Sequence, residues 1–167
     1  MENTVYNGKF IKVTEFKHEN HIWEKAYFPD SLVVIAVTDD QEIIFIEERR
    51  PHEENLVRLK MVTGHIDPGE SALETANREL QEEAGFKAQK LTEILVNRSS
   101  GTINSNFHFI LATGLEESKL PNPDGEDSIV SVKKIKMERV REMLRSGELS
   151  WNLSTLGLFK VLDFYKI

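Results

Sequence analysis

The sequence predicts a layered domain of the α/β or α+β class. Short apolar segments typical of strands stand on both sides of one stretch with helical periodicity, and two further helical stretches end the chain. The chain has 167 residues, of which 40% are hydrophobic and 29% charged, as expected of one globular domain with a buried core.

The first strands are expected in the N-terminal segment. Apolar and polar residues alternate loosely over residues 5–16 and again over residues 21–28. The polar sequence His-Glu-Asn at residues 18–20 separates the two segments and is typical of a turn. This pattern predicts two antiparallel strands.

A second pair of strands is expected directly afterwards. Residues 31–37 and 42–48 are mostly apolar, and Asp39 and Asp40 stand between them. Continuous apolar runs of this length are typical of strands that are buried on both faces. We therefore expect a buried hairpin.

The clearest helix begins at Ser71. Ser71 and Glu74 match a capping box, in which the hydroxyl and the carboxylate each accept a hydrogen bond from a free backbone N–H group. Gly85 stands where a left-handed C-cap is expected. The residues at helical spacing that should face the core are Leu73, Ala76, Leu80 and Ala84.

The remainder of the chain alternates in the same way. Strands are expected over residues 90–97, 106–115 and 128–136, and helices over residues 137–147 and after Trp151.

Composition narrows the class of function. The net charge of −7 argues against a surface for nucleic acid or anionic membranes, because both need a basic footprint. Without cysteine the chain has no disulfide, thiolate zinc site or thiol nucleophile. The longest apolar run, residues 32–37, is too short to span a bilayer, and the start does not match a secretory signal. A cytoplasmic protein is expected.

Three glutamates are crowded on the predicted helix. Glu79, Glu82 and Glu83 share one edge of it, away from the apolar face. Like charges at this spacing repel one another. A hard cation such as Mg²⁺, which prefers oxygen ligands, would compensate the repulsion. The alternative, from these three residues alone, is a solvated acidic face.

The spacing of these glutamates from the preceding loop is more specific. The pattern comprises Gly64, Glu70, Arg78, Glu79, Leu80, Glu82, Glu83, Gly85 and Phe86. At every one of these positions the sequence resembles the Nudix box, the loop–helix–loop motif of enzymes that cleave nucleoside diphosphates linked to another moiety. The resemblance implies a Nudix α/β/α sandwich with a mixed sheet over residues 30–167. It also implies a small antiparallel β-sheet segment over residues 1–29 that serves in dimerisation.

The resemblance further implies which residues bind metal. Glu79 and Glu83 are expected to bind Mg²⁺, or Mn²⁺, directly. Glu82 is expected to share in metal binding and in catalysis. The backbone carbonyl of Thr63 or Gly64 is a further expected ligand.

The other residues of the box are expected to be structural. They are Gly64, Glu70, Arg78 and Gly85. Arg78 should orient the carboxylates, for example through Glu70 or Glu82, rather than contact the substrate.

The flanks of the box resemble the branch of the family that hydrolyses ADP-ribose and other nucleoside diphosphate sugars. The two N-terminal strands, the sequences IFIEERRP and LVRLKMVTGHIDPGE, and the acidic loop at residues 121–128 carry this resemblance. It implies substrate contacts for Arg50, Lys25 and Trp23. The ordinary alternatives are a loop arginine for Arg50 and a packing aromatic for Trp23.

The acidic loop is also expected to hold the general base. Glu126 is preferred for its longer side chain, with Asp127 as the other candidate, and a solvated turn carboxylate is the alternative for both. Two positions depart from the branch: Lys60 stands where it often has Glu, and Ser100 stands where it often has Pro. The second departure favours nucleotide sugars more broadly than ADP-ribose alone.

The sequence therefore predicts a Mg²⁺-dependent pyrophosphatase that converts nucleoside diphosphate sugars into a nucleoside monophosphate and a sugar phosphate. Its expected partners are the small-molecule substrate and a second copy of the chain, with no nucleic acid and no membrane. The alternatives are hydrolysis of nucleoside triphosphates or dinucleoside polyphosphates, and a non-catalytic nucleotide-sugar sensor.

Overall fold

The structure is a computed structural model that describes residues 2–54, 56–121, 128–149 and 154–167. The strands are β1 (Glu2–Asn7), β2 (Lys12–His18), β3 (His21–Tyr27), β4 (Ser31–Ala36), β5 (Glu42–Arg50), β6 (Leu56–Lys60), β7 (Val62–His65), β8 (Phe86–Ser99), β9 (Ile103–Glu117) and β10 (Ile129–Lys136). The helical elements are η1 (Pro51–Glu53), α1 (Ala72–Glu79), η2 (Leu80–Ala84), α2 (Met137–Ser146) and α3 (Ser154–Phe164).

The described strands form two sheets. The larger has the order β1-β2-β3-β9-β4-β7, with β8 paired to β9 on the side, and the smaller has the order β10-β5-β6. Strand β9 runs parallel to β3 and β4, whereas the other pairs are antiparallel, so the larger sheet is mixed. A mixed sheet with helices packed against it confirms the predicted α/β class.

Strands β4 and β5 do not form the expected hairpin. β4 pairs with β9 and β7, and β5 pairs with β10 and β6. Among the described residues, the two strands meet at their turn through an isolated bridge between Val37 and Ile43. Both strands are apolar at successive positions, and each is therefore stabilised by cover on both faces. The turn between them, where Gln41 adopts a left-handed φ of 57°, carries the chain from one sheet into the other.

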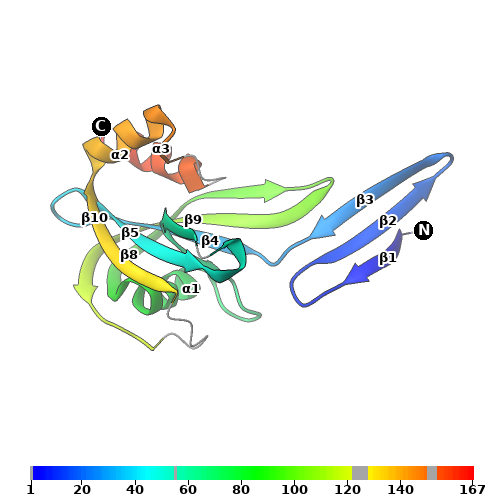
Figure 1. The fold of residues 1–167 in the computed structure, drawn as a ribbon, viewed down its shortest axis with the longest axis horizontal. Coiled ribbons are helices and arrows are strands. Elements are labelled where there is room, and N and C mark those ends of the chain that lie inside the picture. The colour runs from blue at the N-terminus through cyan, green and yellow to red at the C-terminus, as the bar shows by residue number, and fades with distance from the viewer. Residues whose placement is uncertain (1, 55, 122–127, 150–153) are drawn as a thin grey trace.

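The core forms on both faces of β4. Val33 and Ile35 pack with residues of α2 and α3, whereas Leu32 and Val34 pack with residues of α1. Successive strand residues point to opposite faces, so a run without polar residues supplies two apolar layers. In Figure 1, α1 accordingly lies on one side of the strands and α2 and α3 on the other. No helix in the described parts of the chain is long and apolar enough to cross a membrane.

The N-terminal segment contains three strands where two were predicted. A turn divides residues 5–16, in which the backbone N–H of Gly8 donates to the carbonyl of Ile11 at 2.9 Å. The resulting sheet of β1, β2 and β3 projects from the rest of the molecule (Figure 1). It joins β9 through two residue pairs, Ala26 with Ile103 and Tyr27 with Asn104.

Helix α1 begins and ends as its sequence predicts. Ser71 and Glu74 form the full capping box, and Gly85 takes the left-handed conformation after η2, with φ 77°. Ala76 and Leu80 are fully buried, but Leu73 is 39% exposed, so the buried face starts one turn later than expected.

Substitution of Gly157 by alanine should destabilise the fold. A Cβ atom at this position of α3 would lie 2.6 Å from a ring carbon of Phe109 and 3.0 Å from the Cδ1 atom of Ile35. Both neighbours are fully buried, so relief requires shifts within a packed core, which cost about 1–3 kcal/mol. Chemical denaturation of Gly157→Ala measures this loss. The matched control is Lys160→Ala on the exposed side of α3, and equal stability of the two variants would contradict the prediction.

Candidate active site

The candidate site lies where the loop after β7 meets α1 and η2. Four carboxylates of this region, here called the box carboxylates, are Glu70, Glu79, Glu82 and Glu83. The loop and the helix are joined locally, because the hydroxyl of Thr75 donates to Glu70 at 2.7 Å. The capping box and this hydrogen bond fix the first turn of α1 against the loop that precedes it.

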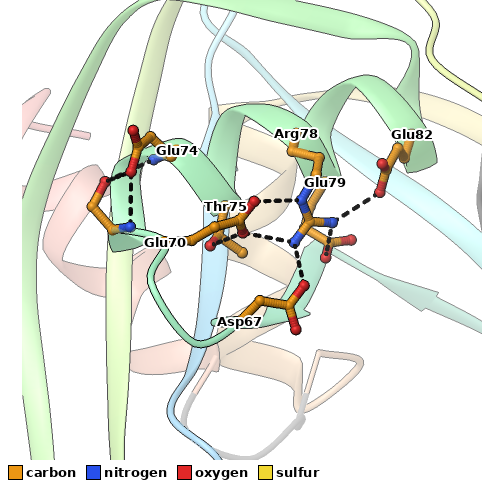
Figure 2. A network of polar contacts seen from close by, with 8 residues as sticks. Asp67, Glu70, Glu74, Thr75, Arg78, Glu79 and Glu82 are labelled. Atoms are coloured by element: carbon orange, nitrogen blue, oxygen red, sulfur yellow. Dashed lines mark hydrogen bonds and ion pairs between the residues drawn. The ribbon is translucent and has the colours of Figure 1, made fainter.

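Arg78 gathers three of the box carboxylates (Figure 2). Its Nη1 atom lies 2.9 Å from Glu79 and 3.0 Å from Glu82, and its Nη2 atom lies 3.0 Å from Glu70. Asp67 of the loop lies farther away, at 3.7 Å. Hydrogen bonding to Glu70 raises the pKa of Arg78, so the guanidinium stays charged. The structure thus brings Arg78 to both of the partners proposed for it from the sequence.

Arg78 acts on the protonation of its partners as well as on their positions. Its hydrogen bonds, together with that of Thr75, lower the pKa of Glu70. Glu79 behaves differently, because burial raises its pKa more than Arg78 lowers it. Arg78 therefore joins a loop carboxylate, Glu70, that is stabilised as the anion to a helix carboxylate, Glu79, that is not.

Gly64 allows this packing. A Cβ atom at residue 64 would lie 2.5 Å from the carboxylate carbon of Glu79, which is closer than atoms can approach. A side chain at residue 64 would therefore displace the Glu79 carboxylate from its present position against β7. This contact explains why glycine, rather than a residue with a side chain, occupies position 64 of the box.

The carboxylate of Glu83 reaches β7 from η2 and is largely enclosed. Its side chain is 13% exposed and accepts a hydrogen bond of 3.2 Å from the backbone N–H of Thr63. Burial raises the pKa of Glu83 to about 7, against the opposing attraction of Lys60 and the Thr63 N–H, and the charges of Glu79 and Glu48 add to the increase. Removal from water is thus the dominant effect on this carboxylate.

Two further charged residues, Glu48 and Lys60, join the site from the smaller sheet. The Nζ atom of Lys60 lies 3.2 Å from Glu48 and 3.7 Å from Glu83. Glu48 was not among the residues expected from the sequence, and Lys60 was noted only as a departure from the family pattern. Glu48 could have been found from its place two residues before Arg50, at the end of a buried strand.

The residues expected to bind substrate fall into two groups. Arg50 lies beside the site, with its Nε atom 2.8 Å from Glu48. Lys25 and Trp23 lie on β3 of the projecting sheet, and no contact between them and the box carboxylates occurs within the described chain. Glu126 and Asp127, the candidates for the general base, lie outside the described residues.

The donor chemistry of the site fits a hard divalent cation. The available donors are carboxylate oxygens and the carbonyls of residues 63 and 64, which are the ligands that Mg²⁺ prefers. In the present arrangement these carboxylates are paired with Arg78 and Lys60 instead. Over the described ranges, no three His, Asp or Glu side chains are arranged to hold a metal ion.

A surface groove of about 580 Å³ lies beyond the C-terminal end of η2. Its lining includes Gly85, Phe86, Lys119 and Val132 but none of the box carboxylates. The groove is therefore not the centre of the candidate chemistry.

Comparison with known proteins assigns the family. The NUDIX domain model matches residues 28–151, which is more than half of the chain. An ADP-ribose pyrophosphatase of Bacillus subtilis (strain 168) is 32% identical over 145 residues, covering 86% of this chain and 72% of that protein. The ADP compounds hydrolase NudE of Escherichia coli (strain K12) is 33% identical over 98 residues, covering 58% of this chain and 52% of that protein.

A solved structure supports the fold. The crystal structure of an ADP compounds hydrolase superposes with a TM-score of 0.83 at 24% identity, covering 99% of this chain and 92% of that one. Together with the family match and the complete box in its observed loop–helix geometry, these similarities lead to one conclusion: the chain belongs to the Nudix family.

Proposed function

We propose that this Nudix hydrolase cleaves the diphosphate of nucleoside diphosphate sugars, with ADP-ribose among its substrates. Water adds to one phosphorus atom, the P–O bond to the bridging oxygen breaks, and the products are a nucleoside monophosphate and a sugar phosphate. The observation that carries the proposal is the grouping of the box carboxylates around Arg78 and the Thr63 N–H. The names of the Bacillus subtilis and Escherichia coli relatives support this class of substrate.

The site would hold a divalent cation, which we take to be Mg²⁺ with Mn²⁺ as the alternative. The proposed ligands are Glu79, Glu82, Glu83 and the backbone carbonyl of Thr63 or Gly64. When bound, such a cation neutralises the charge of a diphosphate and lowers the pKa of a water molecule. The burial of Glu83 supports its place in this set, because a carboxylate that is enclosed and poorly compensated is stabilised by a cation.

The remaining roles, positioning of the ligands, substrate contact and proton removal, are assigned to other side chains of the protein. Arg78 holds Glu79 and Glu82 in position from one side of the helix. We assign Arg50 a contact with the substrate diphosphate or base, and its position beside Glu48 supports this role. We assign removal of the proton from the attacking water to Glu126, with Asp127 as the alternative base.

A substrate panel tests the proposal. The purified protein is assayed with ADP-ribose, other nucleoside diphosphate sugars, nucleoside triphosphates and dinucleoside polyphosphates, with Mg²⁺ or Mn²⁺, and the products are separated by chromatography. We expect a nucleoside monophosphate and a sugar phosphate, and a loss of at least about a hundredfold in kcat for Glu83→Gln, the scale typical of removing one group that stabilises the transition state. The control is Glu74→Gln on the same helix, because glutamine preserves a capping box.

Two results of this panel would contradict the proposal. Release of pyrophosphate or phosphate from triphosphates alone would indicate the other class of substrate. Calorimetric binding of a nucleotide sugar without turnover would indicate a sensor rather than an enzyme.

The buried Glu83 should make the stability of the metal-free protein depend on pH. Its pKa is raised from 4.5 to about 7 in the folded state, so between these values the folded protein keeps a proton that the unfolded chain releases. Stability should therefore fall as the pH rises through this window. Relative to Glu83→Gln, the wild type should lose roughly 3 kcal/mol between about pH 5 and about pH 8. Chemical denaturation in the presence of a chelator measures the difference, and a constant difference at the two pH values would contradict the assignment.

We also propose that residues 1–29 form a dimerisation segment and residues 30–167 the Nudix domain. Strand β1 is an edge strand of the larger sheet, and an unpaired edge favours association with another chain. Large apolar side chains exposed on the projecting sheet are Val5, Tyr6, Phe16, Ile22 and Trp23. A second copy of the chain would cover them and would give Lys25 and Trp23 a route to the partner's site.

Charge placed on the projecting sheet should prevent this dimer. Trp23 is 62% exposed, so glutamate at this position leaves the fold of one chain intact but buries a charge in the dimer. Light scattering should report a dimer for the wild type and a monomer for Trp23→Glu. Leu156→Glu, an equally drastic change at an exposed apolar residue of α3, is the control and should remain dimeric. A monomeric wild type would contradict the proposal.

A further inference from the structure

Lys60 lies among two carboxylates and one hydroxyl that come from three different elements. Its Nζ atom lies 3.2 Å from Glu48 of β5, 3.7 Å from Glu83 of η2 and 3.0 Å from the hydroxyl of Thr63 in β7. The side chain is 15% exposed, so the ammonium is held inside the site rather than on the surface. A lysine in this position is a cation that the chain itself supplies.

The box carboxylates pair with two different basic residues, Arg78 and Lys60. Arg78 pairs with Glu70, Glu79 and Glu82, whereas the ion pair of Glu83 in the described structure is the one with Lys60. The attraction of Lys60 opposes the effect of burial on the pKa of Glu83 and acts on Glu79 as well. Lys60 is therefore the principal counter-charge for the inner end of this acidic edge.

A divalent cation on Glu83 would compete directly with this ammonium. Ligand oxygens approach Mg²⁺ to about 2.0–2.1 Å, so the ion would occupy space beside the same carboxylate that Lys60 now neutralises. Two positive centres within a few ångströms repel strongly in a site that is largely removed from water. The flexible four-carbon stem of lysine allows the ammonium to move while it keeps one carboxylate partner.

We propose that Lys60 is an intramolecular competitor of the divalent cation for Glu83. Its ammonium neutralises Glu83 in the metal-free protein, retreats toward Glu48 when the cation binds, and so lowers the metal affinity of the site. This inference rests on the proposed function, in which Glu83 is a metal ligand. It makes Lys60 a positioning residue that sets the concentration of Mg²⁺ or Mn²⁺ at which the site fills.

Direct measurement of metal binding tests the proposal without reference to turnover. Mn²⁺ is titrated by calorimetry into the full chain, its Lys60→Met variant and a matched control, Lys133→Met. Lys133 pairs with Glu47 on the neighbouring part of the same sheet and is half-exposed, so the control removes the same charge from outside the site. We expect Lys60→Met to lower the Kd for Mn²⁺ by about tenfold or more, because a like charge next to the ion is removed. Lys133→Met should leave the Kd unchanged.

Thermal melting provides the second measurement. In chelator, Lys60→Met should melt at a lower temperature than the wild type, because Glu48 and Glu83 lose their counter-charge. Saturating Mn²⁺ should bring the melting temperature of the variant back to that of the wild type. If Lys60→Met does not fold, Lys60→Gln serves the same comparison, since its amide still donates a hydrogen bond between the two carboxylates but carries no charge.

The outcomes separate this inference from the proposed function. If the wild type binds Mn²⁺ and Lys60→Met binds it equally or more weakly, Lys60 does not compete with the ion, but the proposed metal site is still supported. An equal gain in Lys60→Met and Lys133→Met would also overturn the competition, because it would show an effect of net charge alone. If neither the wild type nor Lys60→Met binds the ion, the inference and the metal assignment both fail.

Discussion

The site depends on compensation of negative charge that folding removes from water. Helix α1 and η2 present several glutamates to a strand that packs against them, and an uncompensated carboxylate in that position would destabilise the fold. Arg78 provides the compensation at the outer end, where it joins Glu70, Glu79 and Glu82. Lys60 provides it at the inner end, where the partners of Glu83 within the described residues are this ion pair and a backbone N–H. Arg78 and Lys60 thus hold in place the carboxylates that the proposed chemistry requires.

The fold supports this arrangement by bringing two sheets to one helix. Strand β7 of the larger sheet supplies Thr63 and Gly64, and the smaller sheet supplies Glu48 and Lys60. The buried face of the helix, with Ala76 and Leu80, packs on the even-numbered residues of β4. Because that face is anchored in the core, the opposite edge of the helix is held at a fixed distance from both sheets. The absence of a side chain at Gly64 leaves room for the Glu79 carboxylate beside β7.

The N-terminal sheet differs from the rest of the molecule in leaving large apolar side chains exposed. Its strands alternate apolar and polar residues as a half-buried sheet does, yet in the single chain large apolar side chains such as Ile22 and Trp23 remain in solvent. It is attached to β9 by only two residue pairs. A segment of this kind is stabilised by cover from another surface, which is why we assign it to association rather than to the core.

The sequence by itself determined the α/β class, the capping box at Ser71, the left-handed cap at Gly85 and the family, because each is encoded in local periodicity, local hydrogen bonding or fixed spacing. It also predicted that Glu79, Glu82 and Glu83 share one edge of the helix. Local pattern could not determine which strands pair, and β4 and β5 therefore separated into different sheets although their sequences indicated a hairpin. It could not place Glu48 and Lys60 beside Glu83 either, since 35 and 23 residues separate them along the chain. Only the packing of two sheets against one helix decided those contacts, because charge compensation acts through space rather than along the chain.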